Sequence, residues 1–152
     1  MKILIELYDH RYELWNYPEW ALAETRALAY AHEVISVASN EQLMEHLPDA
    51  EVFFGWQLTE DKFKLARNLK WLHSASADIQ QQLYPTFIES EITLTMSRGT
   101  RAATIAEHTL GMMLYFARQF NICVRNQMRA HWARGTAWDH FPNFQELTGS
   151  TL

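Results

Sequence analysis

Short apolar runs alternate with amphipathic segments over the first hundred residues of the chain. Five apolar runs predict strands, at residues 2–7, 33–38, 51–56, 70–75 and 92–96. Between them, segments rich in Ala, Leu and Glu predict helices at residues 18–31, 41–47 and 60–66, the last two capped by Asn40 and Thr59. Strands that alternate with helices at this spacing are typical of βαβ units, so we expect a mainly parallel sheet. The pattern predicts an α/β domain with a flavodoxin-like, doubly wound, five-stranded sheet over residues 1–100.

The pattern changes after the fifth predicted strand. Residues 104–128 predict one long α-helix, and Thr104 with Glu107 fits a capping box at its start. Its apolar residues form two stripes rather than one, which indicates burial on two sides. We therefore interpret residues 101–152 as a long helix, residues 105–128 at its centre, that packs on another domain, a second subunit or both, followed by a mixed tail.

Composition narrows the class of protein. The chain has 152 residues, 48% of them hydrophobic, and a net charge of −5. An acidic surface does not favour nucleic-acid binding, and the single Cys123 excludes an internal disulfide and a thiolate metal site. No histidine pair has the spacing of a zinc site, so we expect no metal. We find neither a signal peptide nor an apolar run long enough for a membrane span, and we expect a cytoplasmic protein.

Candidate site residues follow from the fold. Ligands of doubly wound sheets bind beyond the carboxyl ends of the strands. Trp56 ends the third predicted strand and is a candidate wall of a pocket, although ordinary core packing explains it equally well. Arg98 and Arg101 flank Gly99 after the fifth strand. A guanidinium there can bind a carboxylate through two parallel hydrogen bonds, or it can simply be solvated.

Three stretches, in the correct order, resemble the D-isomer-specific 2-hydroxyacid dehydrogenase family. Residues 69–77, Leu-Lys-Trp-Leu-His-Ser-Ala-Ser-Ala, are similar to its pattern Leu-Lys-Trp-Ile-x-x-x-x-Ala-Gly-x-Asp. Residues 98–99, Arg-Gly, and 105–108, Ile-Ala-Glu-His, followed by a long apolar helix, resemble its Val-Ala-Glu-His segment. Residues 146–152, Glu-Leu-Thr-Gly-Ser-Thr-Leu, resemble the segment Leu-x-Gly-Lys-Thr-Leu that opens its cofactor domain.

The resemblance implies the amino-terminal, substrate-binding part of an NAD(P)-dependent oxidoreductase acting on D-2-hydroxy acids or 2-oxo acids. Its partners would be a small acid, the dinucleotide-binding domain and a second copy bound through the 105–128 helix. The family's Gly-rich turn for NAD or NADP and its catalytic residues would follow the last residue of this chain. We therefore expect no catalytic residue, no bound cofactor and no activity in this chain alone.

The family binds the substrate carboxylate with backbone amides at the Ala-Gly part of a loop, which implies a role for Ser76, Ala77 and Asp78. This chain has Asp78 where the family has Gly, and a carboxylate would repel a bound carboxylate. The alternative interpretation is that Asp78 only caps a helical turn through Gln82.

Other classes fit less well. A response-regulator receiver needs an Asp after the third strand and a Lys after the fifth, where this chain has Gly55-Trp56 and Ser97-Arg98. A flavodoxin needs a phosphate loop after the first strand, where this chain has Tyr8-Asp9-His10. A non-catalytic α/β interaction module that associates through its long helix remains the alternative.

Overall fold

The computed structural model describes residues 1–132, 134–135 and 144–151. The chain forms two compact units, Met1–Gly99 and Thr100–Leu152. Among the described residues, no helix combines the length and the apolar character that crossing a membrane requires. Each unit is described separately below.

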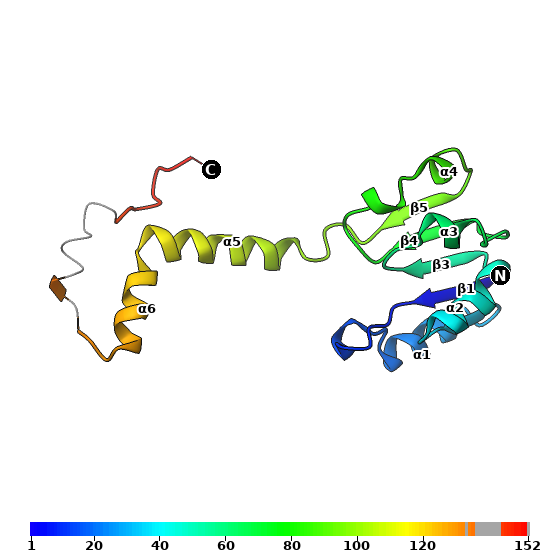
Figure 1. Cartoon of the computed structure of the whole chain (residues 1–152), viewed down its shortest axis with the longest axis horizontal. Coiled ribbons are helices and arrows are strands. Elements are labelled where there is room, and N and C mark those ends of the chain that lie inside the picture. The colour runs from blue at the N-terminus through cyan, green and yellow to red at the C-terminus, as the bar shows by residue number, and fades with distance from the viewer. Residues whose placement is uncertain (133, 136–143, 152) are drawn as a thin grey trace. The chain divides into compact units, whose positions relative to one another are not determined.

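The first unit is built on a five-stranded sheet in the order β2-β1-β3-β4-β5 (Figure 1). Its strands are β1 (Lys2–Glu6), β2 (Glu33–Ser36), β3 (Val52–Gly55), β4 (Trp71–Ser74) and β5 (Thr93–Met96). Every neighbouring pair is parallel. The predicted flavodoxin-like, doubly wound fold is therefore confirmed.

Four α-helices and three 3-10 helices lie in the connections between these strands, and their sequences explain which face of the sheet they cover. The α-helices are α1 (Glu19–Leu28), α2 (Asn40–His46), α3 (Glu60–Phe63) and α4 (Pro85–Ile88), and the 3-10 helices are Glu13–Trp15, Leu47–Asp49 and Gln80–Gln82. Leu4, Phe53 and Leu72 occupy paired positions on β1, β3 and β4, so their side chains point to the same face of the sheet. There they pack with residues of the α2 to α4 side, including Leu43, Leu47, Leu58 and Phe87.

The opposite face has a smaller core. Ile5 and Val34 pack there against Leu22 of α1, with Phe54 and Trp56 partly buried at its border. Toward β4 and β5 this face becomes polar within the first unit, because it presents Trp71, His73 and Thr95.

The helix starts differ from the predicted caps. Ser39, rather than Asn40, precedes α2, and its hydroxyl accepts a hydrogen bond from Gln42 N at 3.3 Å. Thr59 precedes α3 as predicted, but its side chain makes no capping bond, and α3 ends at Phe63 instead of Ala66. The 3-10 helices and α4 were not predicted, because segments this short carry no periodic pattern.

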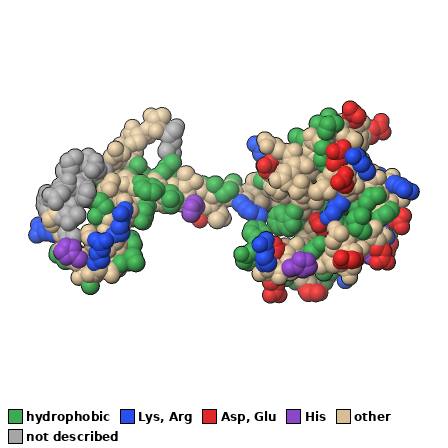
Figure 2. Space-filling model, viewed as in Figure 1, with side chains coloured by type: hydrophobic (Ala, Val, Ile, Leu, Met, Phe, Trp, Pro, Cys, Tyr) green, Lys and Arg blue, Asp and Glu red, His purple; other side chains and the backbone are tan. Residues whose placement is uncertain are grey.

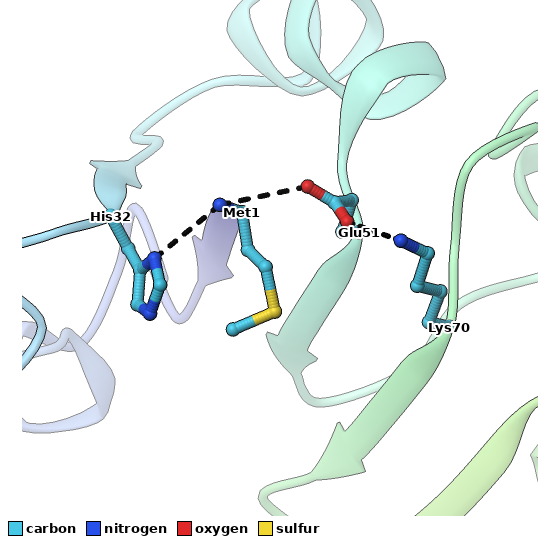
Figure 3. Close-up of polar contacts among 4 residues, drawn as sticks. All are labelled: Met1, His32, Glu51 and Lys70. Atoms are coloured by element: carbon cyan, nitrogen blue, oxygen red, sulfur yellow. Dashed lines mark hydrogen bonds and ion pairs between the residues drawn. The ribbon is translucent and has the colours of Figure 1, made fainter.

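Charged groups at the amino edge of the sheet pair with one another, as Figure 3 shows. The Glu51 carboxylate lies 2.6 Å from Lys70 Nζ and 3.7 Å from the Met1 ammonium. The Lys70 hydrogen bond lowers the pKa of Glu51 below its ordinary value. The Met1 nitrogen also lies 3.4 Å from His32 Nδ1. Charges at this edge are thus matched within the unit.

The second unit contains two helices where one was predicted. Helix α5 (Ala102–Ala117) and helix α6 (Phe120–Met128) are separated at Gln119, whose backbone is left-handed with a φ of 53°. A left-handed residue ends a helix because it turns the next amides away from the helix axis. The Gln119 side chain donates to Phe116 O at 3.2 Å, and Gln145 N donates to Ala117 O at 2.9 Å. These donors satisfy carbonyls that a continuous helix would have paired itself.

The predicted capping box is wrong. Helix α5 starts two residues earlier than expected, with Arg101 at the N-cap, so Thr104 lies inside its first turn. Ala117 is the one buried residue of α5 and α6, and the unit leaves most of the two apolar stripes exposed (Figure 2). The larger exposed side chains are Ile105, Leu110, Met112, Leu114, Phe116, Phe120, Val124 and Met128. Residues 146–151 are described without a strand, and Leu152, the last residue of the third motif, lies outside the described residues.

Gly55, at the end of β3, is tightly enclosed. A Cβ atom there would lie 2.7 Å from two ring carbons of Phe53 and 3.0 Å from the carbonyl oxygen of Glu6. Phe53 is fully buried and the Glu6 carbonyl belongs to β1, so neither can yield without disturbing the core. The enclosure fixes the point at which the chain leaves the sheet toward Trp56.

We predict that Gly55→Ala lowers the free energy of unfolding by about 1–3 kcal/mol, because the added methyl overpacks this site. Urea denaturation measures the change. Gly111→Ala is the matched control, since a Cβ atom in this part of α5 meets nothing within 4 Å. The control is expected to be neutral or stabilising by up to about 1 kcal/mol, because Ala favours helix more than Gly does. An unchanged stability of Gly55→Ala would contradict the enclosure.

Candidate functional site

The carboxyl ends of four strands meet in register at one edge of the sheet. Glu6 of β1 pairs with Gly55 of β3, Gly55 pairs with Ser74 of β4, and Ser74 pairs with Met96 of β5. The ladder continues one step beyond the strands, because Ala75 N donates to Gly55 O at 2.8 Å and Ser97 N donates to Ser74 O at 3.0 Å. The loops that follow these strands therefore start from fixed positions.

The loop after β4 is ordered by its own side chains. Ser76 N donates to Ser74 Oγ at 3.2 Å, and Asp78 N donates to Ser76 Oγ at 3.1 Å. Gln80 N then donates to Asp78 Oδ1 at 2.9 Å, just before the 3-10 helix Gln80–Gln82. The Asp78 carboxylate therefore accepts from the first amide of this helical turn, whose N-cap residue is Ile79.

Ala77 provides the one site amide of this loop that still points outward. Ser97 N donates to Ser76 O at 3.2 Å, which turns the Ser76 carbonyl toward β5. Carbonyl and N–H of a trans peptide point in opposite directions, so the Ala77 N–H points away from β5. Ala77 is exposed, and its N–H has no acceptor among the described residues. Such an amide can receive an anion without a charged side chain.

Trp56 is held beside this loop by both its backbone and its ring. Its carbonyl accepts hydrogen bonds from Gln82 Nε2 at 3.1 Å and from Ser74 Oγ at 3.5 Å. Its ring meets the Trp15 ring edge-on, with 5.6 Å between centroids and 79° between planes. Trp56 and Ala75 pack against the same apolar cluster. Packing therefore holds Trp56 at the carboxyl edge of the sheet.

The two arginines are placed differently. Arg98 follows Ser97 directly and is exposed at the carboxyl edge, within the first unit. Arg101 is exposed at the N-cap of α5, in the second unit. Trp56, Ser76, Ala77, Asp78 and Arg98 therefore gather at one edge of the first unit, whereas Arg101 lies outside it.

Sequence analysis missed several residues that shape this edge. Gln82 is buried although it lies in a run of three glutamines, and its Oε1 has no hydrogen-bond donor among the described residues. Trp15, His73 and Ser97 also contribute, through contacts across segments that are distant in sequence. No local pattern could have found them, because each role depends on a partner in another loop or strand.

Glu6 lies at the same edge, largely buried at the end of β1. Burial raises the pKa of its carboxyl above the ordinary value, and the Lys62 ammonium, 3.9 Å away, offsets only part of this effect. On the loop after β1, the amides of Arg11 and Tyr12 donate to Asp9 Oδ1 and lower the pKa of Asp9.

We find neither a cluster of metal-binding side chains nor a Gly-rich phosphate turn among the described residues. They contain no group of three or more His, Cys, Asp or Glu side chains that could hold a metal ion. A pyrophosphate needs a Gly-rich turn between a strand and a helix. In the first unit, the loop from Leu7 to Asn16 after β1 has no glycine, and the loop after β5 has Gly99 alone. We therefore assign no hydride-transfer step to this chain.

Comparisons with known proteins agree with the fold. No family model and no curated protein matches the sequence. The chain is similar to the NAD-dependent formate dehydrogenase from Staphylococcus aureus in complex with NAD, with 24% identity and a TM-score of 0.64, covering 92% of this chain and 45% of that chain. It is also similar to an acyclic imino acid reductase in complex with NADPH and D-Arg, with 15% identity and a TM-score of 0.64, covering 95% of this chain and 44% of that chain.

At these identities the likeness shows a shared fold. The fold that the motifs implied is confirmed to that extent, because the chain shares it with both structures. The chain spans less than half the length of either structure.

The raised pKa of Glu6 predicts a dependence of stability on pH. The native state binds this proton more tightly than the unfolded chain does, so the stabilisation is complete below the unfolded value of 4.5 and is lost as pH rises through the raised folded value. Glu6→Gln keeps the side-chain shape and is expected to remove this loss. The measurement is urea denaturation from about pH 4 to about pH 8.

The control is Glu45→Gln on the exposed side of α2, which should keep the wild-type slope. If Glu6→Gln and the wild type lose stability in parallel as pH rises above 4.5, the burial of Glu6 does not control the slope.

Proposed function

We propose that this chain is the substrate-binding part of an NAD(P)-dependent oxidoreductase of the D-isomer-specific 2-hydroxyacid dehydrogenase family. Its substrate would be a small D-2-hydroxy acid or 2-oxo acid. The observation that carries the proposal is the outward-pointing Ala77 amide, in the loop where the sequence resembles the family's carboxylate-binding segment. The fold shared with a formate dehydrogenase and an imino acid reductase supports it.

In this proposal the residues at the carboxyl edge have different roles in binding the substrate. The Ala77 N–H donates to one oxygen of the substrate carboxylate, and the neighbouring Ser76 orders the loop through its hydroxyl. Arg98 supplies the positive charge, since its guanidinium can bind both carboxylate oxygens. Trp56 forms the apolar wall for the substrate side chain. Arg101, which lies in the second unit, remains a separate prediction from the sequence.

NAD or NADP and the hydride-transfer chemistry are assigned to a dinucleotide-binding domain outside the residues of this chain. This assignment rests on the absence of a Gly-rich turn among the described residues and on the share of the similar enzymes that the chain covers. We further propose that the protein is cytoplasmic, that this chain alone is inactive, and that it forms a homodimer through the 105–128 segment.

The exposed apolar side chains of α5 and α6 support an alternative, a non-catalytic module that binds a protein partner through these helices. The two functions differ in their ligands. The first requires a small carboxylate at Ala77, whereas the second requires only the helices of the second unit.

Asp78 provides the sharpest test of the substrate site. Its carboxylate would stand next to a bound anion and repel it, yet its Oδ1 also caps Gln80. Asp78→Asn keeps that acceptor and removes the charge, so we expect pyruvate to bind about 2- to 5-fold more tightly, as two charges a few ångströms apart at a surface would predict. NMR titration of the full chain, following the Ala77 amide, measures the affinity.

Glu33→Gln makes the same change of net charge at the start of β2, at the opposite edge of the sheet, and is expected to leave the affinity unchanged. Pyruvamide, which lacks the carboxylate, should not bind. If pyruvate leaves the Ala77 amide unmoved in both wild type and Asp78→Asn, the substrate-site proposal fails.

The homodimer is tested separately by sedimentation. We expect the wild-type chain to associate with increasing concentration, because the second unit leaves Phe116 and Phe120 56% and 48% exposed. Phe116→Glu combined with Phe120→Glu should shift the chain toward monomer. Gln127→Glu adds charge to α6 without removing apolar surface and should not. A wild-type chain that stays monomeric at high concentration would rule out this interface.

A further inference from the structure

Four side chains, Trp71, Thr95, His73 and Ser97, form a continuous hydrogen-bonded row across β4 and β5. Trp71 Nε1 donates to Thr95 Oγ1 at 2.8 Å, and Thr95 Oγ1 lies 2.7 Å from His73 Nδ1. On the other side of the ring, His73 Nε2 lies 3.2 Å from Ser97 Oγ. The row ends at the carboxyl edge, one residue beyond β5.

The chemistry of the row favours one ring nitrogen of His73 as the carrier of the proton. An indole N–H only donates, so Thr95 accepts from Trp71 and has its own proton left to give. Among the described residues His73 Nδ1 is the acceptor within reach of that proton. Nδ1 then accepts, and the proton of the neutral ring lies on Nε2, from which it is donated to Ser97 Oγ.

The surroundings of the ring support the neutral form. The Phe54 and Trp71 rings lie beside it, with centroids 5.1 and 6.4 Å away. The hydroxyls of Thr95 and Ser97 contact its two ring nitrogens. None of these side chains is charged, and burial alone lowers the pKa of His73. The imidazole is therefore neutral at physiological pH and has a single N–H to direct.

Ser97 connects the row to the substrate loop. His73 holds its hydroxyl, and its backbone N–H binds the carbonyls of Ser74 and Ser76 at 3.0 and 3.2 Å. The Ser76 carbonyl belongs to the peptide whose other end is the Ala77 N–H. Any rotation of that peptide changes the direction of the amide that the proposed function assigns to the carboxylate.

We propose that His73, held by Thr95 as its Nε2–H tautomer, is a positioning residue that fixes Ser97 and thereby aims the Ala77 amide at an anionic ligand. This inference rests on the proposed function for its ligand, but not for its tautomer. His73 itself does not contact the ligand. The row would act through geometry, since every step in it is a hydrogen bond between uncharged groups.

The tautomer is tested first, by long-range proton–nitrogen NMR correlation of His73 in the full chain without ligand. We expect the pattern of a protonated Nε2 and an unprotonated Nδ1. Thr95→Val removes the hydroxyl at similar volume and should abolish this preference, while Thr95→Ser should preserve it. Thr93→Val is the matched control, because Thr93 lies on the same strand and its hydroxyl makes no hydrogen bond among the described residues.

The positioning role is tested with the same variants. Thr95→Val should shift the Ala77 amide resonance in the absence of ligand and weaken pyruvate binding by about 2- to 10-fold, the range expected for one lost hydrogen bond. Thr95→Ser should restore both, and Thr93→Val should change neither. Thermal denaturation of Thr95→Val against Thr93→Val shows whether a general loss of folding contributes. The wild-type tautomer tests the first step even if Thr95→Val does not fold.

The outcomes separate the two proposals. A wild-type His73 protonated on Nδ1 would overturn the inference and leave the proposed function intact. The expected tautomer, with an Ala77 amide and a pyruvate affinity that Thr95→Val does not change, would also overturn the positioning role alone. If pyruvate does not shift the Ala77 amide resonance in the wild type, both the proposed function and this inference are wrong.

Discussion

The parallel register of β1, β3, β4 and β5 is the constraint on which the rest of the first unit depends. It ends four strands at Glu6, Gly55, Ser74 and Met96, which are paired across the sheet. The loops beyond them must then share a small space and satisfy each other's backbone groups. Ser97 N does this for two carbonyls at once, and the outward direction of the Ala77 amide is a consequence.

The two edges of the sheet meet this constraint in different ways. At the amino edge, charged groups neutralise one another around Glu51. At the carboxyl edge, neutral groups make these hydrogen bonds: serine hydroxyls, the Gln82 amide and the His73 imidazole. Neutral donors can receive an anion without a fixed countercharge. Arg98 is exposed at the same edge.

The second unit is shaped by a break in its helical segment. Gln119 in the left-handed region divides the helical segment, and Gln145 and the Gln119 side chain satisfy the carbonyls exposed by the break. The apolar stripes of α5 and α6 remain exposed within the unit. Periodicity predicted those stripes correctly, but it predicted a continuous helix because a left-handed glutamine has no sequence signal, unlike a left-handed glycine.

The order of the strands, their parallel pairing, helices α1 to α3 and the loop that carries Ser76, Ala77 and Asp78 could be predicted from the sequence, because hydrophobic period and local motifs are properties of neighbouring residues. Long-range packing was needed to show that Ser39 caps α2, that the Asp78 carboxylate binds the Gln80 amide, and that the Asp78 amide is engaged by Ser76 while that of Ala77 is not. It alone joined His73 to Thr95 and Ser97 across β5. Hydrogen bonds between distant segments depend on where strands end relative to one another, and that placement comes from packing rather than from any local pattern.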